Sequence, residues 1–418
     1  MRSKKRSKVF AVAVVVTVAA AALTGLAAPS ASAAAPKGST IVFGSIETQT
    51  SPTGGKITTT GDTLNAWVKW TNAHGGIAGH PVKVIVKDDK ADPAQASAAL
   101  KELVEQDHAV AIVGQNAPAT ADTWKTYVEQ QQVPVLGGAE YSTIWFTSPM
   151  YYPVSGTFVT TIYAQAFAAK DAGKKKYASI LCANLSVCQG AAQVVKQQVE
   201  GLGMQFVYSG FADQNAASYT PQCLAAKDAG ADVLSPQGVN QANVVRDCSR
   251  QNYNPTYIST NFSYTLQQIK NTPAFEGNIG PTPSISPYES FAVTKDRDAA
   301  IKKYAPQYSK GGKLYTTTGL LPLSDSWEAA EAFKLAVERS GVAANATVTN
   351  TDIIKGLATF NQETLNGSNP PLSYGDGTKA NAQVKCFYLY KIKNGNYVSN
   401  TKKDPKTGQP TPTLYCES

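Results

Sequence analysis

Short apolar runs alternate with amphipathic segments along most of the chain. TIVFGSI (40–46) and AVAIVG (109–114) have the length and the β-branched content of buried strands. Between them, in DTLNAWVKWTNA (62–73), Leu64 and Trp67 are spaced as on one face of a helix. Strands that alternate with helices in this way predict a parallel sheet with helices on both faces, which is an α/β fold.

The alternation runs through the chain twice, which predicts two lobes rather than one large sheet. YYPVSGTF (151–158) is the expected link between the two runs, and a solvated, proline-rich loop is expected over 402–413. The other expected strands are 81–89, 133–138, 177–181, 204–209, 231–235, 256–260 and a pair within 383–399. The other expected helices begin at Pro93 or cover 119–132, 189–202, 218–229, 239–250, 295–309, 324–340 and 350–359.

The first 33 residues have the three parts of a secretory signal peptide. MRSKKRSK is basic, the run 9–28 is almost wholly Ala, Val and Leu, and a small-residue A-x-A site predicts cleavage after Ala33. An uncleaved membrane anchor is the alternative, because the run is about long enough to span a bilayer. No cysteine precedes Cys182 to carry a lipid. We therefore expect a protein without a lipid anchor, secreted or held in the cell envelope.

The charge of the mature chain argues against nucleic acid as a partner. The formal charge of +8 includes five basic residues of the leader, so cleavage lowers it to +3. The rest of the chain has no basic run, and a nucleic-acid binder would need one. The length of the mature chain suits about two domains.

The chain contains six cysteines, an even number that suits an oxidising compartment. Six cysteines allow 15 pairings, so the connectivity stays open. Proximity along the chain suggests the pairs Cys182–Cys188, Cys223–Cys248 and Cys386–Cys416. We expect no metal site, because there is no C-x-x-C and the three histidines, His74, His80 and His108, lack ligand spacing.

Two loops at the carboxyl ends of predicted strands are candidates for a ligand site. In AIVGQNAPATADTW (111–124) a helix starting near Pro118 would aim unpaired N–H groups at a carboxylate, and Thr120 would add a hydroxyl. The loop after the next strand provides the carboxylate of Glu140 and the aromatic ring of Tyr141. In an open parallel sheet, ligands bind at this edge, so the two loops predict a cleft for a small molecule.

No motif predicts an enzyme. G-x-S-x-G and H-E-x-x-H are absent, and SNTK (399–402) and KTG (406–408) lie in a tail loop that cannot orient them. We therefore expect no catalytic residue and no cofactor. Ser324 and Asp325 are expected to cap a helix whose Trp327 would stand at the cleft edge, against an apolar part of the ligand.

One long segment, NAHGGIAGHPVKVIVKDDKADPAQASAALKELVEQDHAVAIVG (72–114), resembles the extracellular substrate-binding proteins of branched-chain amino acid ABC importers. The resemblance continues through VEQQQVPVLGGAEYST and more loosely beyond it. It implies a type I periplasmic-binding fold of two Rossmann-like lobes. The implied lobes are 39–154 with 285–373, and 155–284 with 374–418. The implied crossings are near Val154–Ser155, Pro283–Ser286 and Tyr374–Gly377.

The resemblance also implies ligand contacts. The matching positions are Asn116, Ala117, Pro118, Ala119 and Thr120, then Ala139, Glu140 and Tyr141 in the first lobe, and Asn184, Gln237 and Asn261 in the second. Two departures concern the ligand. Asn261 stands where amino-acid binders place an acid, and neither Asn184 nor Gln237 is aromatic. Either Glu140 meets the ligand's ammonium, or the ligand lacks one and is an amide, a hydroxy or keto acid, or an aromatic acid.

The resemblance implies a monomeric binding protein that captures a small ligand and docks on the membrane permease of an ABC importer. An extracellular sensor or amide-responsive regulator on the same fold is the alternative. A secreted hydrolase is a third class, and the absence of a nucleophile–base pair argues against it.

Overall fold

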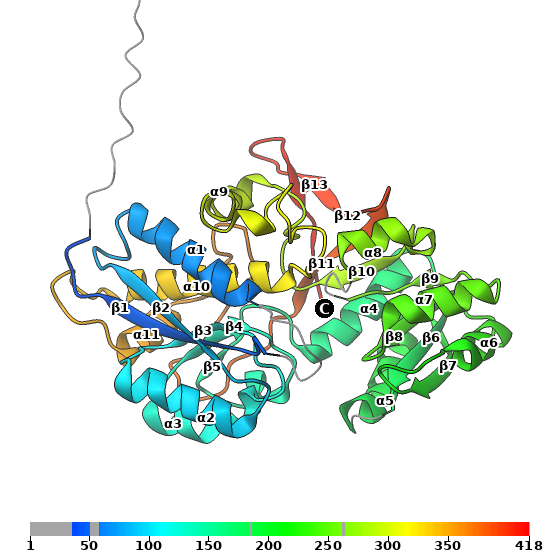
Figure 1. The fold of residues 1–418 in the computed structure, drawn as a ribbon, viewed down its shortest axis with the longest axis horizontal. Coiled ribbons are helices and arrows are strands. Elements are labelled where there is room, and N and C mark those ends of the chain that lie inside the picture. The colour runs from blue at the N-terminus through cyan, green and yellow to red at the C-terminus, as the bar shows by residue number, and fades with distance from the viewer. Residues whose placement is uncertain (1–35, 51–57, 184–185, 261–263, 418) are drawn as a thin grey trace, which may run out of the picture.

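The computed structural model describes residues 36–50, 58–183, 186–260 and 264–417. Two α/β lobes lie side by side, each built on its own sheet (Figure 1). The first sheet has the order β2-β1-β3-β4-β5, and all of its pairs are parallel. Its strands are β1 (Ile41–Glu47), β2 (Val82–Asp88), β3 (Ile112–Gln115), β4 (Val135–Gly138) and β5 (Tyr151–Tyr152).

Helices cover both faces of the first sheet, because successive strand residues point to opposite sides. Phe43 of β1 packs in a cluster with α1, α10 and α11, whereas Ile46 packs in a second cluster with α2 and α3. The helices of this lobe are α1 (Thr59–Ala73), α2 (Pro93–Lys101), α3 (Lys125–Gln131), α9 (Lys295–Tyr304), α10 (Leu321–Ser340) and α11 (Asn350–Leu357). Helices α9, α10 and α11, which follow residue 290, thus complete the lobe whose strands come from the N-terminal part of the chain.

The second lobe holds a parallel sheet of order β7-β6-β8-β9. Its strands are β6 (Lys176–Cys182), β7 (Gln205–Ala212), β8 (Val233–Gln237) and β9 (Thr256–Tyr257). Its helices are α4 (Phe158–Asp171), α5 (Ser186–Gly201), α6 (Thr220–Asp228), α7 (Gln241–Arg250) and α8 (Leu266–Asn271). A bridge between Ile258 and Ile279 continues this sheet into an antiparallel one.

The antiparallel sheet contains the C-terminal strands. β11 (Cys386–Lys393) pairs with β10 (Ile279–Thr282), β12 (Asn396–Ser399) and β15 (Leu414–Cys416). The expected strand pair within 383–399 is confirmed. The expected loop over 402–413 is wrong in part, because β13 (Thr401–Lys403) and β14 (Pro410–Pro412) form a short hairpin there.

Three further expectations differ from the structure. The expected link 151–158 contains β5 and leads into α4, a helix that the sequence pattern did not reveal. The helix expected over 119–132 divides into a 3-10 turn, Ala121–Trp124, and α3. α10 begins at Leu321 with a proline in its first turn, so Ser324 and Asp325 lie inside the helix and do not cap it.

Every tryptophan of the chain lies in the first lobe. Trp67, Trp124 and Trp145 are fully buried, and Trp70 is partly buried on α1. Trp327 is 5% exposed in the buried cluster that includes Leu136 and Phe333. The expectation that Trp327 stands at the cleft edge is therefore wrong, because α10 packs it into the core of the lobe.

Three disulfides are present, and they are the pairs that proximity suggested. Cys182–Cys188 joins the end of β6 to α5, Cys223–Cys248 joins α6 to α7, and Cys386–Cys416 joins β11 to β15. Within the described ranges, no helix combines the length and the hydropathy needed to cross a membrane. The expected signal peptide, residues 1–33, lies outside those ranges.

Candidate ligand-binding cleft

The chain passes between the lobes three times, and buried side chains tie the first and third crossings together. The Tyr374 hydroxyl of the third crossing donates to the carbonyl of Pro153 in the first, at 2.7 Å. Asn369 Nδ2 donates to Val154 O, and Asn381 Nδ2 donates to Tyr151 O, each at 2.9 Å. These bonds hold two crossings in one geometry, as a hinge requires.

Glu140 belongs to this hinge and does not face the cleft. Its Oε1 accepts from the N–H of Val154 at 2.7 Å and from the N–H of Ser155 at 3.1 Å. The residue is 3% exposed, and burial raises the pKa of its carboxyl well above the ordinary value. The expectation that Glu140 meets a ligand ammonium is therefore not supported, because the first crossing occupies its carboxylate.

Two more buried carboxyl groups hold the second crossing. Asp325 Oδ1 accepts from the Ser284 hydroxyl at 2.9 Å. The neighbouring carboxyl of Glu328 faces Asp325, and Arg297 is its cationic neighbour. Arg297 also donates to the carbonyl of Ile285 at 3.1 Å, so its guanidinium helps to fix this crossing. Burial raises the pKa of Asp325 to about 7 and that of Glu328 well above its usual value.

These raised pKa values predict a stability that falls as the pH rises. Asp325 binds its proton more tightly in the folded chain, so its contribution is full below its unfolded pKa and is lost as the pH rises through about 7. Wild-type protein should melt at a higher temperature at about pH 5 than at about pH 8. Asp325→Asn should flatten this dependence. Melting curves that rise towards pH 8, or that are identical in wild type and variant, would contradict the prediction.

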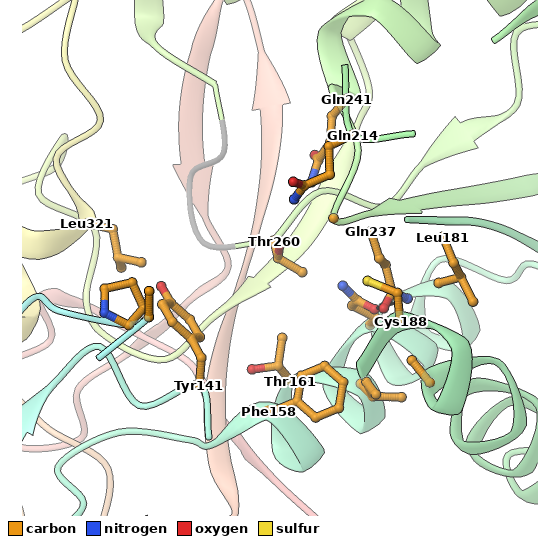
Figure 2. Close-up of a pocket in the computed structure, with 16 residues that line it drawn as sticks. Tyr141, Phe158, Thr161, Leu181, Cys188, Gln214, Gln237, Gln241, Thr260 and Leu321 are labelled. Carbon is orange, nitrogen blue, oxygen red and sulfur yellow. Dashed lines mark hydrogen bonds between the residues drawn. The ribbon is translucent and has the colours of Figure 1, made fainter. Parts of the chain in front are cut away.

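A cavity of about 790 Å³ lies between the lobes beside the hinge. Tyr141 and Leu321 stand on the first-lobe side, Gln237, Leu181 and Cys188 stand on the second-lobe side, and Phe158 and Thr161 come from α4 (Figure 2). The other lining residues are Pro118, Ala119, Ile162, Gln165, Ala191, Gln214, Gly238, Gln241 and Thr260. Both lobes thus contribute side chains to one cleft.

The two expected first-lobe loops do meet at the sheet edge. Gln115 joins them, because its Nε2 donates to Ala139 O at 3.0 Å and its Oε1 accepts from Ala117 N at 2.8 Å. Gly138 permits this contact, since a Cβ there would lie 2.0 Å from the carbonyl oxygen of Gln115. Asn116 and Ala139 line a smaller cavity nearby, and Ala117 is fully buried.

The first-lobe loop lacks the anion site that was expected at Thr120. The backbone N–H groups of Thr120 and Ala121 both donate to Ala117 O, immediately before the 3-10 turn Ala121–Trp124. The Thr120 hydroxyl donates to Asp89 Oδ2 at 2.5 Å and is fully buried. The expected role of Thr120 is therefore wrong in this structure, whereas Pro118 and Ala119 do line the cleft.

On the second lobe, Gln237 lines the cleft as expected, and Asn184 and Asn261 lie outside the described residues. Sequence reasoning missed Phe158, Thr161, Ile162 and Gln165, because it missed the helix α4 that carries them. It also missed Gln214 and Gln241, which follow second-lobe strands as the strand-edge rule would have allowed. Among the described residues, no group of three or more His, Cys, Asp or Glu is arranged to hold a metal ion.

Comparison with known proteins agrees with this architecture. The family model described as periplasmic binding protein matches residues 40–396. No curated protein matches the chain.

Matches to solved structures with this fold span almost the whole length of those structures. A leucine binding protein from Thermotoga maritima is 15% identical with a TM-score of 0.65, over 86% of this chain and 97% of that one. A solute binding protein of an ABC transporter from Rhodopseudomonas palustris, in complex with p-hydroxybenzoic acid, is 19% identical with a TM-score of 0.65, over 86% and 95%. An extracellular ligand-binding receptor from Verminephrobacter eiseniae is 16% identical with a TM-score of 0.70, over 86% and 99%.

The family match covers most of the chain, and the fold is that of type I periplasmic binding proteins, with two lobes joined by a three-crossing hinge. The chain therefore belongs to the periplasmic binding protein family.

Proposed function

We propose that the protein is the extracellular solute-binding component of an ABC importer and captures a small polar ligand, an amino acid or a related amide or acid, between its lobes. The observation that carries this proposal is the cleft, which both lobes line beside a three-crossing hinge. A ligand that contacts both walls favours the closed arrangement, because only that arrangement makes both sets of contacts.

The proposed lobes are residues 39–154 with 285–373, and residues 155–284 with 374–418. The proposed ligand contacts combine the expected residues at the cleft with those of α4. They are Pro118, Ala119, Tyr141, Phe158, Thr161, Gln165, Gln214, Gln237 and Gln241. Tyr141 is 47% exposed in the open cleft, so closure of the lobes would cover its ring.

The proposed partner of the closed form is the membrane permease of the importer, which accepts the monomeric binding protein and its ligand. Cleavage after Ala33 would release a mature chain without a lipid anchor. One similar structure is a leucine binding protein and another is a complex with p-hydroxybenzoic acid. These similarities support a small organic ligand but do not identify it.

A thermal-shift screen with small-angle scattering tests this proposal. A ligand at a hundredfold excess over Kd should raise the free energy of unfolding by about 2.7 kcal/mol and reduce the radius of gyration as the lobes close. Ala119→Trp should abolish both effects, because the new side chain fills the cleft from an exposed position. Ala94→Trp, at an exposed position of α2, is the matched control. Binding that survives Ala119→Trp, or that leaves the radius of gyration unchanged, would argue against a clamshell.

A further inference from the structure

The cleft is lined by uncharged side chains. Among the described residues that line it there is no Asp, Glu, Lys, Arg or His. We propose that the ligand is an uncharged solute that carries amide or hydroxyl groups and an apolar part, rather than a zwitterionic amino acid or an organic anion. This inference rests on the proposed function and specifies its substrate class.

A ligand ammonium would find no carboxylate in the described cleft wall. Glu140 bonds to the first crossing in the hinge. Asp325 lines the smaller neighbouring cavity, which shares Tyr141 and Leu321 with the cleft, and its carboxyl accepts from the Ser284 hydroxyl. Moving the Glu140 carboxylate to a ligand would leave two buried N–H groups of the first crossing without partners, which is costly. A buried cation without a paired charge is costly as well.

A ligand carboxylate would find the expected anion site closed. The N–H groups of Thr120 and Ala121 donate to the carbonyl of Ala117, and Pro118 has no N–H. The Thr120 hydroxyl is committed to Asp89, whose negative charge also disfavours an anion nearby. Two backbone donors and the hydroxyl group that were expected to bind a carboxylate in this loop are therefore already occupied.

Glutamine side chains dominate the polar lining of the second-lobe wall. Gln237 Nε2 donates to Gln165 Oε1 at 2.8 Å, which fixes the orientation of both amides. Within the described part of the chain, this leaves the carbonyl of Gln237 as an acceptor and the amide nitrogen of Gln165 as a donor. A neutral donor–acceptor pair of this kind complements a carboxamide or a hydroxyl group, each of which both donates and accepts.

Gln241 adds an independent indication of a ligand donor. Its Oε1 is shielded from solvent and has no hydrogen-bond partner among the described residues. Gln241 lies beside Gln214 at one end of the cleft (Figure 2). A buried amide oxygen without a partner is unfavourable, and rotation of the Gln241 side chain toward an N–H or O–H of the ligand would satisfy it.

The remaining lining suits the apolar part of such a ligand. Tyr141 and Phe158 present aromatic rings from the first lobe and from α4, while Leu181 and Leu321 lie on opposite walls (Figure 2). Apolar walls with a few oriented polar groups are typical of sites for small molecules. The described residues of the cleft therefore complement the hydrogen-bonding pattern and the shape of a ligand, and none of them carries a charge.

Ligands that share a skeleton and differ in charge test this inference on the mature protein. The probes are leucine, leucinamide, isocaproate and isocaproamide, then p-hydroxybenzoate with p-hydroxybenzamide, and glucose with inositol as neutral polyols. Calorimetry should give a neutral probe an affinity at least about tenfold above that of every charged probe. Its Kd should change less than about twofold between low and high salt, because no ion pair is formed.

Each result separates the inference from the proposed function. A charged probe that binds as tightly as its neutral partner, and closes the lobes, overturns the inference and leaves the proposed function standing. If no solute of either kind binds or closes the lobes, the proposed function fails together with the inference. Preferential binding of isocaproamide or p-hydroxybenzamide identifies a carboxamide ligand, and preferential binding of the polyols identifies a hydroxyl-rich one; both support an uncharged class.

A variant pair checks that the glutamine wall makes the contact. Gln237→Glu keeps the shape but replaces the donor to Gln165 with a carboxylate, so affinity for the neutral probe should fall about tenfold or more. Gln197→Glu, at an exposed position of α5, should leave affinity within about twofold. Equal affinities of wild type and Gln237→Glu would overturn the assignment of this wall.

Discussion

Replacement of Trp327 by alanine is expected to lower the free energy of unfolding by about 3–5 kcal/mol and to leave ligand affinity unchanged. The indole is 5% exposed in the core of the first lobe, so the truncation removes buried apolar surface and opens a void that rigid neighbours cannot fill. Denaturant unfolding gives the stability, and calorimetry of the folded fraction gives the affinity.

Tyr141→Ala is the matched control, because it removes an aromatic ring of the cleft. This ring is 47% exposed, so its loss should change stability by about 0.5 kcal/mol or less but weaken ligand binding. If Trp327→Ala weakened binding at unchanged stability, Trp327 would be a ligand contact after all. The structural assignment of α10 would then be wrong.

Loss of the Cys223–Cys248 disulfide is expected to lower the free energy of unfolding by about 3 kcal/mol. The bridge spans 25 residues and joins α6 to α7, so its removal gives the unfolded chain more freedom. Both half-cystines are fully buried in the second-lobe core and lie outside the cleft lining. A Cys223→Ala/Cys248→Ala double variant should therefore bind ligand normally once folded, as calorimetry would measure.

The Cys182–Cys188 disulfide provides the opposite case. It spans six residues, so its removal should cost only about 2 kcal/mol. Cys188 lines the cleft, however, and the bridge connects β6 to the helix that follows it. The Cys182→Ala/Cys188→Ala variant should thus lose more free energy of ligand binding than free energy of unfolding. Equal affinity losses in the two double variants would contradict this division of roles.

The periodic parts of the fold were predictable from sequence, because burial on sheet faces imposes a pattern that a short window contains. The strands near 40–46 and 109–114 and the helix that starts at Pro93 all formed. α4 was missed, since its first turns are rich in aromatic and β-branched residues and its burial is decided by the sheets that it packs against. The four cleft residues that α4 carries were lost with it.

The sequence placed the two candidate loops at the sheet edge, where the structure has a cleft, but it did not reveal which of their side chains face that cleft. Sequence places Glu140 and Thr120 in loops at the cleft, as the structure does. Their partners are distant in sequence: Ser155 lies 15 residues from Glu140, and Asp89 lies 31 residues from Thr120. Such contacts exist only after the crossings and the sheet are assembled, so no local pattern could reveal that these groups are already occupied.

The confinement of all five tryptophans to one lobe has a consequence for spectroscopy. Indole emission, excited at the red edge where tyrosine does not absorb, reports the melting of that lobe alone. Circular dichroism, by contrast, sums the helices of both halves. A comparison of the two signals during one heating scan therefore distinguishes a molecule that melts as a single unit from one whose halves come apart in sequence.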